Sequence, residues 1–121
     1  MNGYILSVTS PQDLAATLST VSPSEYVRFV ADWMERATNL DEAPMLTGML
    51  VVDAFVAAAA AHVAFVSGAA AVPDWTEDPA RISETLWYLG PDALFPNALV
   101  NTPLSFVVHG VLVDADSLVS V

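Results

Sequence analysis

The segment from Met45 to Val66 constrains the fold more than any other part of this chain. It reads MLTGMLVVDAFVAAAAAHVAFV and contains two ionisable side chains, Asp53 and His62. About 20 apolar residues are enough to span a membrane as a helix. However, a carboxylate near the middle of a span costs about 2.5–3.5 kcal/mol, and no Lys or Arg flanks either end to set an orientation. We therefore expect a buried central helix over about residues 44–67, because a helix that is apolar all round belongs inside a bundle.

Asp53 and His62 are not expected to work together. They are nine residues apart, which puts them on opposite sides of a helix with 3.6 residues per turn. Each is expected at the margin of the bundle, bonded to a neighbour or to water. Ser67-Gly68 predicts the end of the helix, because glycine readily takes the left-handed conformation of a C-terminal cap.

Two Ser-Pro signals predict helices before the central stretch. In Ser10-Pro11-Gln12-Asp13 the serine can cap a helix, the proline suits the first helical position, and the aspartate can bond back to the cap. A similar signal occurs at residues 22–25, and apolar residues then follow at helical spacing, which predicts a face that packs on the core. The residues of this second face are Tyr26, Phe29, Val30, Trp33, Met34 and Ala37.

Proline becomes frequent after Val72, which favours short helices and turns over long elements. Asp78-Pro79 predicts the start of a helix with Ile82, Leu86 and Leu89 on its apolar face. The β-branched run at 107–113 predicts one short edge strand, for which no second convincing strand is found, and Asp114 predicts a cap for a final turn at 115–119.

The expected fold class is mainly α. It is a compact helical bundle around the central helix at about 44–67, with short helices and turns and room for one short strand near the C-terminus. A chain of 121 residues suits a single domain, 1–121. We divide it into a helical N-terminal half, 1–68, and a proline-punctuated C-terminal module, 73–121.

The charge balance restricts the partners. Three arginines, no lysine and fourteen carboxylates give a net charge of −11. Such a chain repels nucleic acid and anionic membranes, so we expect neither as a direct partner. A basic protein surface is the complementary partner. It also stays open that the acidity only keeps an apolar domain soluble, and that the chain forms a homo-oligomer. The first thirteen residues lack the positive charge of a signal peptide, so we expect a cytoplasmic protein.

No sequence pattern predicts catalysis. There is no cysteine, the two histidines do not occur at metal-ligand spacing, and neither a phosphate-binding glycine loop nor a GxSxG motif is present. We therefore expect no enzyme activity, cofactor or metal. The nearest approach to an acidic cluster is Asp74, Glu77 and Asp78. Glu77 and Asp78 lie where a helix N-terminus favours negative charge, so their expected role is capping.

Residues 73–121 contain the pattern PxWTxxPxR, a W[FY] pair, [ST]PxxF, and a close that follows R[GN][IV][FL][IV]xxxxL except at its first position. The matching residues are Pro73, Trp75, Thr76, Pro79, Arg81, Trp87, Tyr88, Thr102, Pro103, Phe106, Gly110, Val111, Leu112, Val113 and Leu118. This pattern resembles the C-terminal module of a group of uncharacterised actinobacterial antitoxin-like proteins, which are encoded beside nucleotidyltransferase-type toxins. Where the group carries arginines after the Phe, this chain has Val107, Val108 and His109. No DNA-binding helix-turn-helix is recognisable upstream.

The resemblance implies an antitoxin-like protein that neutralises a toxin by direct contact. An acidic inhibitor or nucleic-acid mimic that binds another basic protein is the first alternative, and a small enzyme of unknown chemistry is the second. Aromatic residues dominate interface energetics, although each of them can equally pack inside the domain. The candidate partner-binding residues are Trp75, Trp87, Tyr88 and Phe95, together with Asp74, Glu77 and Asp78.

Overall fold

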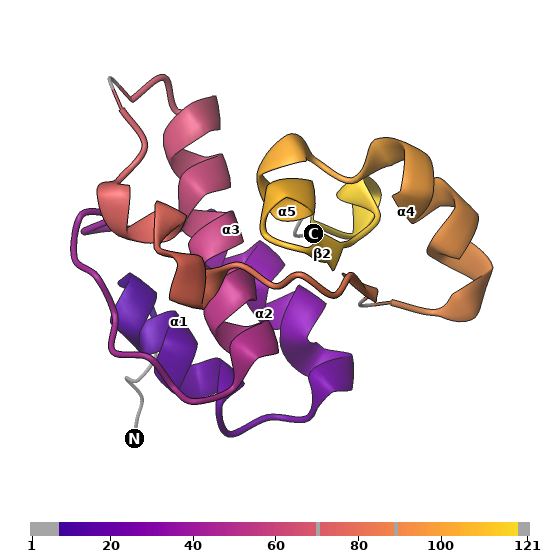
Figure 1. Cartoon of the computed structure of the whole chain (residues 1–121), viewed down its shortest axis with the longest axis horizontal. Helices are drawn as coiled ribbons and strands as arrows, with labels where there is room; N and C mark the ends of the chain where they lie inside the picture. The colour runs from indigo at the N-terminus through magenta and orange to yellow at the C-terminus, as the bar shows by residue number, and fades with distance from the viewer. Residues whose placement is uncertain (1–7, 70, 89, 119–121) are drawn as a thin grey trace.

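The computed structural model describes residues 8–69, 71–88 and 90–118. Within them the chain is mainly helical and has one small parallel sheet (Figure 1), which confirms the predicted fold class. The α-helices are α1 (Pro11–Leu18), α2 (Tyr26–Met34), α3 (Leu50–Val66), α4 (Phe95–Asn101) and α5 (Leu104–Val108). The strands are β1 (Trp87–Tyr88) and β2 (Val111–Leu112). The 3-10 turns are η1 (Pro23–Glu25), η2 (Asp74–Glu77), η3 (Pro79–Arg81), η4 (Asp92–Leu94) and η5 (Ala115–Leu118).

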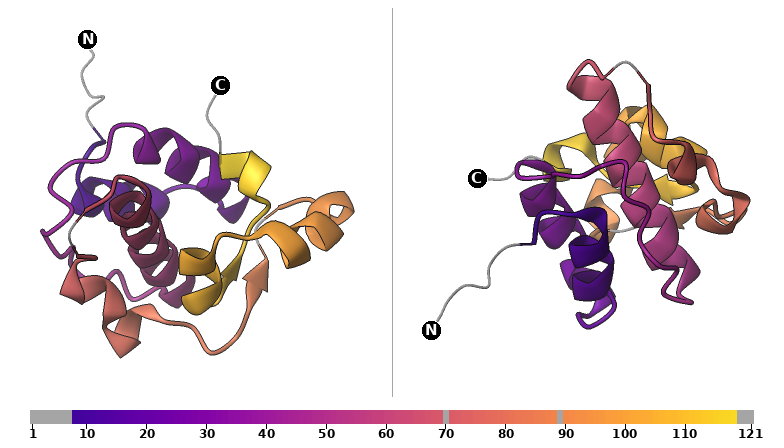
Figure 2. Two further views of the ribbon diagram at one scale, coloured as in Figure 1. Left: turned by 90° about the horizontal axis from the view of Figure 1, so that it is seen from above. Right: turned by 90° about the vertical axis from the view of Figure 1, so that its left-hand side faces the viewer.

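Helix α3 is the central element, as the apolar stretch predicted. It is buried without a break from Val52 to Ala61. Helices α1, α2 and α5 and the turns η2 and η3 all contact it. The left panel of Figure 2 shows α3 with α1 and α2 on one side and α4 and α5 on another, while η5 returns to pack beside α2. None of the helices in the described ranges is long and apolar enough to cross a membrane.

The predicted start of this helix, near residue 44, is wrong. Helix α3 begins at Leu50, because the preceding residues form a turn that Asp53 holds. The carboxylate of Asp53 accepts hydrogen bonds from the Thr47 backbone N–H at 3.0 Å and from the Thr47 hydroxyl at 2.9 Å. Gly48 lies inside this turn with φ of +86°, a left-handed conformation that favours glycine. The Asp53 side chain is therefore bonded to a neighbour, Thr47, and it is buried. The prediction that it lies at the margin of the bundle is wrong.

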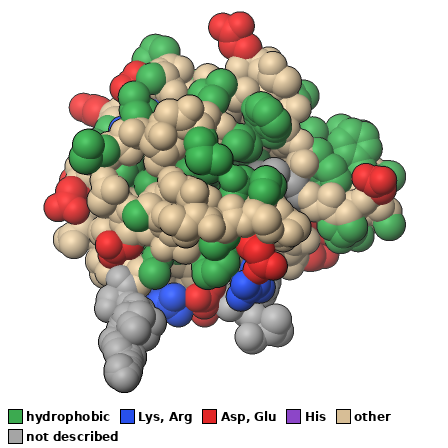
Figure 3. Space-filling view, turned by 90° about the horizontal axis from the view of Figure 1, so that it is seen from below, with side chains coloured by type: hydrophobic (Ala, Val, Ile, Leu, Met, Phe, Trp, Pro, Cys, Tyr) green, Lys and Arg blue, Asp and Glu red, His purple; other side chains and the backbone are tan. Residues whose placement is uncertain are grey.

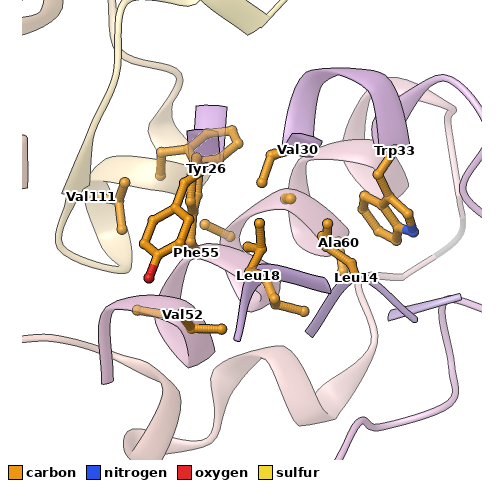
Figure 4. Close-up of a cluster of buried hydrophobic side chains, with 14 of the residues drawn as sticks. Leu14, Leu18, Tyr26, Val30, Trp33, Val52, Phe55, Ala60 and Val111 are labelled. Carbon is orange, nitrogen blue, oxygen red and sulfur yellow. The ribbon is translucent and has the colours of Figure 1, made fainter. Parts of the chain in front are cut away.

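Helix α1 forms as its local signal predicted, whereas the second Ser-Pro signal forms only the turn η1. Ser22 makes no capping bond there, and α2 begins at Tyr26. Ser10 Oγ accepts a bond from the Asp13 backbone N–H, and Asp13 Oδ2 accepts one from the Ser10 backbone N–H, both at 3.1 Å. These two bonds are the reciprocal capping box. Figure 4 shows the core that α1 and α2 make against α3, with Leu14 and Leu18 facing Val30 and Ala60.

The C-terminal module differs from the prediction. Asp78-Pro79 starts only the turn η3. The prediction of a helix after this signal is wrong. The chain instead runs extended into β1, which pairs in parallel with β2 in the register Trp87 with Val111 and Tyr88 with Leu112. Of the expected apolar helix face, Leu86 is exposed and Leu89 lies outside the described residues. The β-branched run also divides, because its first residues belong to α5 and only Val111–Leu112 is a strand.

Side-chain bonds to the backbone explain why residues 82–86 are extended. The Ser83 hydroxyl donates to the Thr85 carbonyl at 2.6 Å, and the same oxygen accepts from the Thr85 N–H at 3.1 Å. Such local bonds compete with helix formation. The Ser83 N–H also donates to the His109 carbonyl at 3.1 Å. Gly110 permits this close approach, since a Cβ there would lie 2.3 Å from the Ser83 carbonyl oxygen.

Candidate partner-binding surface

Trp75 is held inside the molecule. Its indole N–H donates to the Leu40 carbonyl at 2.7 Å, and the Arg81 guanidinium lies 5.1 Å from the ring centroid. The side chain is half-buried and packs against the core. These contacts fasten η2 to the connector between α2 and α3, which precedes it by 35 residues.

Two further residues of the module, Arg81 and His109, fasten it in the same way. Arg81 is 5% exposed and donates from Nη2 to the Pro44 carbonyl, while its Nε and Nη1 have no hydrogen-bond partner in the described part of the chain. The His109 ring lies between two carbonyl oxygens, with Nδ1 2.7 Å from Ser105 and Nε2 2.6 Å from Thr76. We call Trp75, Arg81 and His109 the polar clamp, because each binds backbone carbonyl groups that are distant in sequence or belong to another element.

The acidic cluster is exposed at the end of the module that lies against α3. Asp74, Glu77 and Asp78 are all exposed, on and beside η2. Asp78 Oδ1 accepts a bond from the Ala80 N–H at 3.0 Å and caps η3, which agrees with the capping role expected for this cluster. Figure 1 shows that η2 and β1 lie at opposite ends of the extended segment 82–86. The seven predicted residues therefore do not form one continuous site.

The remaining aromatic residues lie at the other end of that segment. Trp87 and Tyr88 are consecutive in β1, so their side chains leave opposite faces of the strand. Trp87 is exposed and its indole N–H donates to Ser83 Oγ at 3.0 Å. The Tyr88 ring meets the Phe95 ring edge to face, with centroids 5.1 Å apart. Burial of the phenol raises the pKa of Tyr88 above its ordinary 10.0, and the nearby carboxylates Asp114 and Asp92 add to this effect.

Phe95 belongs to a projecting part of the molecule, residues 92–101, which we call the arm. Figure 3 shows this part as a lobe beside the body on which hydrophobic side chains gather. Phe95, Leu99 and Val100 are exposed, and Ala98 is the buried residue of α4. Asp92 is exposed at the start of the arm.

The base of the arm is fixed to the residues that follow β2. The Asn101 amide donates to Asp114 Oδ1 at 2.7 Å and accepts from the Ala115 N–H at 3.2 Å. The Thr102 hydroxyl is 3.0 Å from the Val113 carbonyl oxygen and 3.1 Å from the Val113 nitrogen. The aromatic pair Tyr88–Phe95 is thus presented by an anchored element.

A second exposed apolar surface lies where α3 meets α5. A hollow of about 250 Å³ is lined by His62, Phe65, Pro103, Leu104 and Ser105. The His62 ring packs 5.6 Å from the ring of Phe106, and partial burial lowers the pKa of His62 below its ordinary 6.5. Among the described residues, no group of three or more His, Cys, Asp or Glu side chains is placed to hold a metal ion.

Sequence reasoning overlooked several exposed apolar residues. Leu99, Val100, Leu104 and Phe65 are all exposed, yet none was singled out as a candidate. One signal was available, because residues 93–113 contain no Asp, Glu, Lys or Arg. A run of that length without charge, outside the central helix, leaves too many apolar side chains for one buried face.

Comparisons of this chain with family models, with curated proteins and with solved structures found no match. The resemblance to antitoxin-like proteins therefore stays a prediction.

Proposed function

We propose that this protein is antitoxin-like and neutralises a basic toxin by direct contact through its C-terminal half. One observation carries the proposal. Residues 73–118 expose six carboxylates, and their single cation, Arg81, is buried. The exposed carboxylates are Asp74, Glu77, Asp78, Glu84, Asp92 and Asp116.

The two other arginines do not offset this charge. Arg28 pairs with Glu25, and Arg36 pairs with Asp32 at 2.8 Å, so both are engaged on α2 and its flanks in the N-terminal half. The potential of the C-terminal half is therefore negative. A negative surface attracts a basic partner over a distance, speeds its association and disfavours partners of the same sign.

The arm supplies the apolar anchor that a charged surface needs. Interfaces obtain most of their affinity from a few aromatic or Arg side chains surrounded by weaker contacts. Phe95 is exposed, is oriented by Tyr88 and has Asp92 close by in sequence. We assign Phe95 the role of anchor, with Asp92 three residues before it, and the more distant carboxylates the role of attracting a basic partner.

The proposal is tested by co-expression with the product of the adjacent gene, the toxin that the resemblance implies. The wild-type protein should suppress toxicity and co-purify with the toxin. Phe95→Ala should weaken binding at least about tenfold, as expected for an anchor. Met45→Ala, at an exposed apolar residue before α3, is the control and should leave toxin binding unchanged. A toxin that still kills in the presence of the wild-type protein would overturn the proposal.

The charge contribution is tested with two double variants that carry the same net charge. Asp74→Asn with Glu77→Gln removes two carboxylates of the C-terminal half, whereas Asp41→Asn with Glu42→Gln removes two exposed carboxylates of the connector before α3. The first pair should slow association more than the second. Equal effects would mean that only the total charge matters.

The same six carboxylates favour one alternative, an acidic inhibitor or nucleic-acid mimic of another basic protein. Binding by charge alone should weaken steeply as salt rises and should be competed by DNA. Binding that depends on Phe95 should retain an apolar part that salt does not remove. The salt dependence of wild-type and Phe95→Ala binding therefore separates the two functions.

A further inference from the structure

The residues that line the hollow between α3 and α5 come from two stretches of sequence without charged side chains. Residues 54–73 and 93–113 contain no Asp, Glu, Lys or Arg, although the whole chain has a net charge of −11. Helices α3 and α5, which lie in these two runs, pack against each other. Phe65 and Leu104 line the hollow and are 74% and 76% exposed. We call Phe65, Pro103, Leu104 and Val108 the apolar face.

The size of the hollow indicates what occupies it. Pockets for small molecules measure roughly 300–1,000 Å³ and include a few placed polar groups. This hollow measures about 250 Å³ and is lined mainly by apolar atoms of α3 and α5. It fits one inserted side chain better than a ligand.

We propose that the apolar face binds a second copy of this chain in a two-fold symmetric dimer, in which Phe65 of each copy lies in the hollow of the other. A two-fold interface places the same patch on both subunits, so the patch must be complementary to itself. Here a protruding side chain and a hollow of matching character lie side by side, because Phe65 lines the rim of the hollow.

Electrostatics selects this face for self-association. Two copies with a net charge of −11 repel each other, and the repulsion is greatest where the exposed carboxylates meet. Homodimer interfaces are more apolar than other protein surfaces and are depleted of charge at their centre. A basic partner gains most at the acidic surface. A second acidic copy is disfavoured least at the face formed by the two charge-free runs.

The dimer is tested on the pure protein by sedimentation velocity over a wide range of protein concentration. We expect a concentration-dependent dimer in the wild type. Phe65→Asp and Leu104→Asp should each raise the dissociation constant of the dimer at least about 30-fold, the effect of losing an interface hot spot. Because both side chains are exposed, these variants should keep the wild-type circular dichroism spectrum.

Met45→Asp is the matched control. Met45 is 78% exposed and lies just before the N-terminal end of α3, whereas Phe65 lies at the C-terminal end. The Met45→Asp variant should therefore dimerise like the wild type apart from the effect of one added charge. A protein that stays monomeric at every concentration would overturn the proposal. So would a dimer that Phe65→Asp and Leu104→Asp leave intact, or one that Met45→Asp weakens equally.

Salt distinguishes this inference from the proposed function. Raising the salt from about 0.05 to about 0.5 M screens the repulsion between two acidic copies, so the dimer should become tighter. Binding of a basic partner should become weaker under the same change. A dimer that dissociates in high salt would contradict an apolar interface, whether or not the protein neutralises a toxin.

Discussion

The N-terminal and C-terminal halves of this molecule are each stabilised by a different kind of interaction. In residues 8–68, regular helices, of which α1 begins at a capping box, bury apolar side chains against one another, while the arginines pair on the outside. In residues 73–118, short elements are held by side chains that bind backbone groups, and large apolar residues remain exposed. The first half owes its structure mainly to burial, and the second owes more to a small number of polar contacts.

This difference explains where binding surfaces occur. Among the described residues, the N-terminal half exposes its large hydrophobic side chains at the two ends of α3, where Met45 and Phe65 lie, and buries those between α1, α2 and the middle of α3. The C-terminal half keeps Phe95, Leu99 and Leu104 exposed, because its short helices cannot turn every apolar residue toward α3. The polar clamp holds η2, η3 and the end of α5, and Asn101 and Thr102 hold the arm, without covering these side chains.

The largest expected effect is on the N-terminal half. Leu18 is fully buried between α1 and its neighbours, and Leu18→Ala should destabilise the protein by about 2–5 kcal/mol. Chemical denaturation would measure this loss. Val100→Ala shortens a side chain that is 85% exposed and should change the stability by no more than about 0.5 kcal/mol. If both variants lost the same stability, the proposed dependence of the first half on burial would be wrong.

A smaller and more local effect is expected from the polar clamp. Both ring nitrogens of His109 lie within hydrogen-bond distance of a carbonyl oxygen, and in either tautomer one of them donates. His109→Ala would leave that carbonyl without its donor, at about 1–3 kcal/mol for a buried group that stays unsatisfied. Hydrogen exchange should show loss of protection in η2, α5 and β2, with α1 and α2 retaining theirs.

Two observations would contradict the expectation that His109→Ala loosens the C-terminal half alone. One is an equal loss of protection in α1 and α2, which would mean that the halves unfold only together. The other is the same pattern in His62→Ala, the control. No hydrogen bond of the His62 ring is found among the described residues, so that variant removes packing but no clamp.

How far the sequence predicts this structure depends on how local each cause is. The capping box of α1 lies within four residues, and the burial of α3 follows from its own lack of charge, so both could be predicted. The start of α3 could not, because it depends on how Asp53 binds Thr47 across a turn that contains Gly48. Strand β1 was missed because its partner lies 24 residues away and their approach requires Gly110.

The candidate surface follows the same rule. Exposed carboxylates were predictable, since charged side chains rarely stay inside. The orientation of each aromatic residue was not, because Trp75 turns inward to Leu40 and Phe95 projects on the arm. The aromatic candidates chosen from the sequence thus include both a residue of the polar clamp, Trp75, and a candidate anchor, Phe95.

The smallest expected effect concerns the seam between the two halves. His62 on α3 packs against Phe106 on α5, and its partial burial lowers its pKa below the ordinary 6.5. As the pH falls below 6.5, the unfolded chain takes up this proton before the folded chain does, so the free energy of unfolding falls. The loss should level off once the pH is below the pKa of His62 in the folded protein. An NMR titration of the His62 ring should therefore give a midpoint below 6.5, and His62→Phe should remove this part of the pH dependence. A midpoint at or above 6.5 would mean that the ring is open to water, and that α5 packs more loosely on α3 than α1 and α2 do.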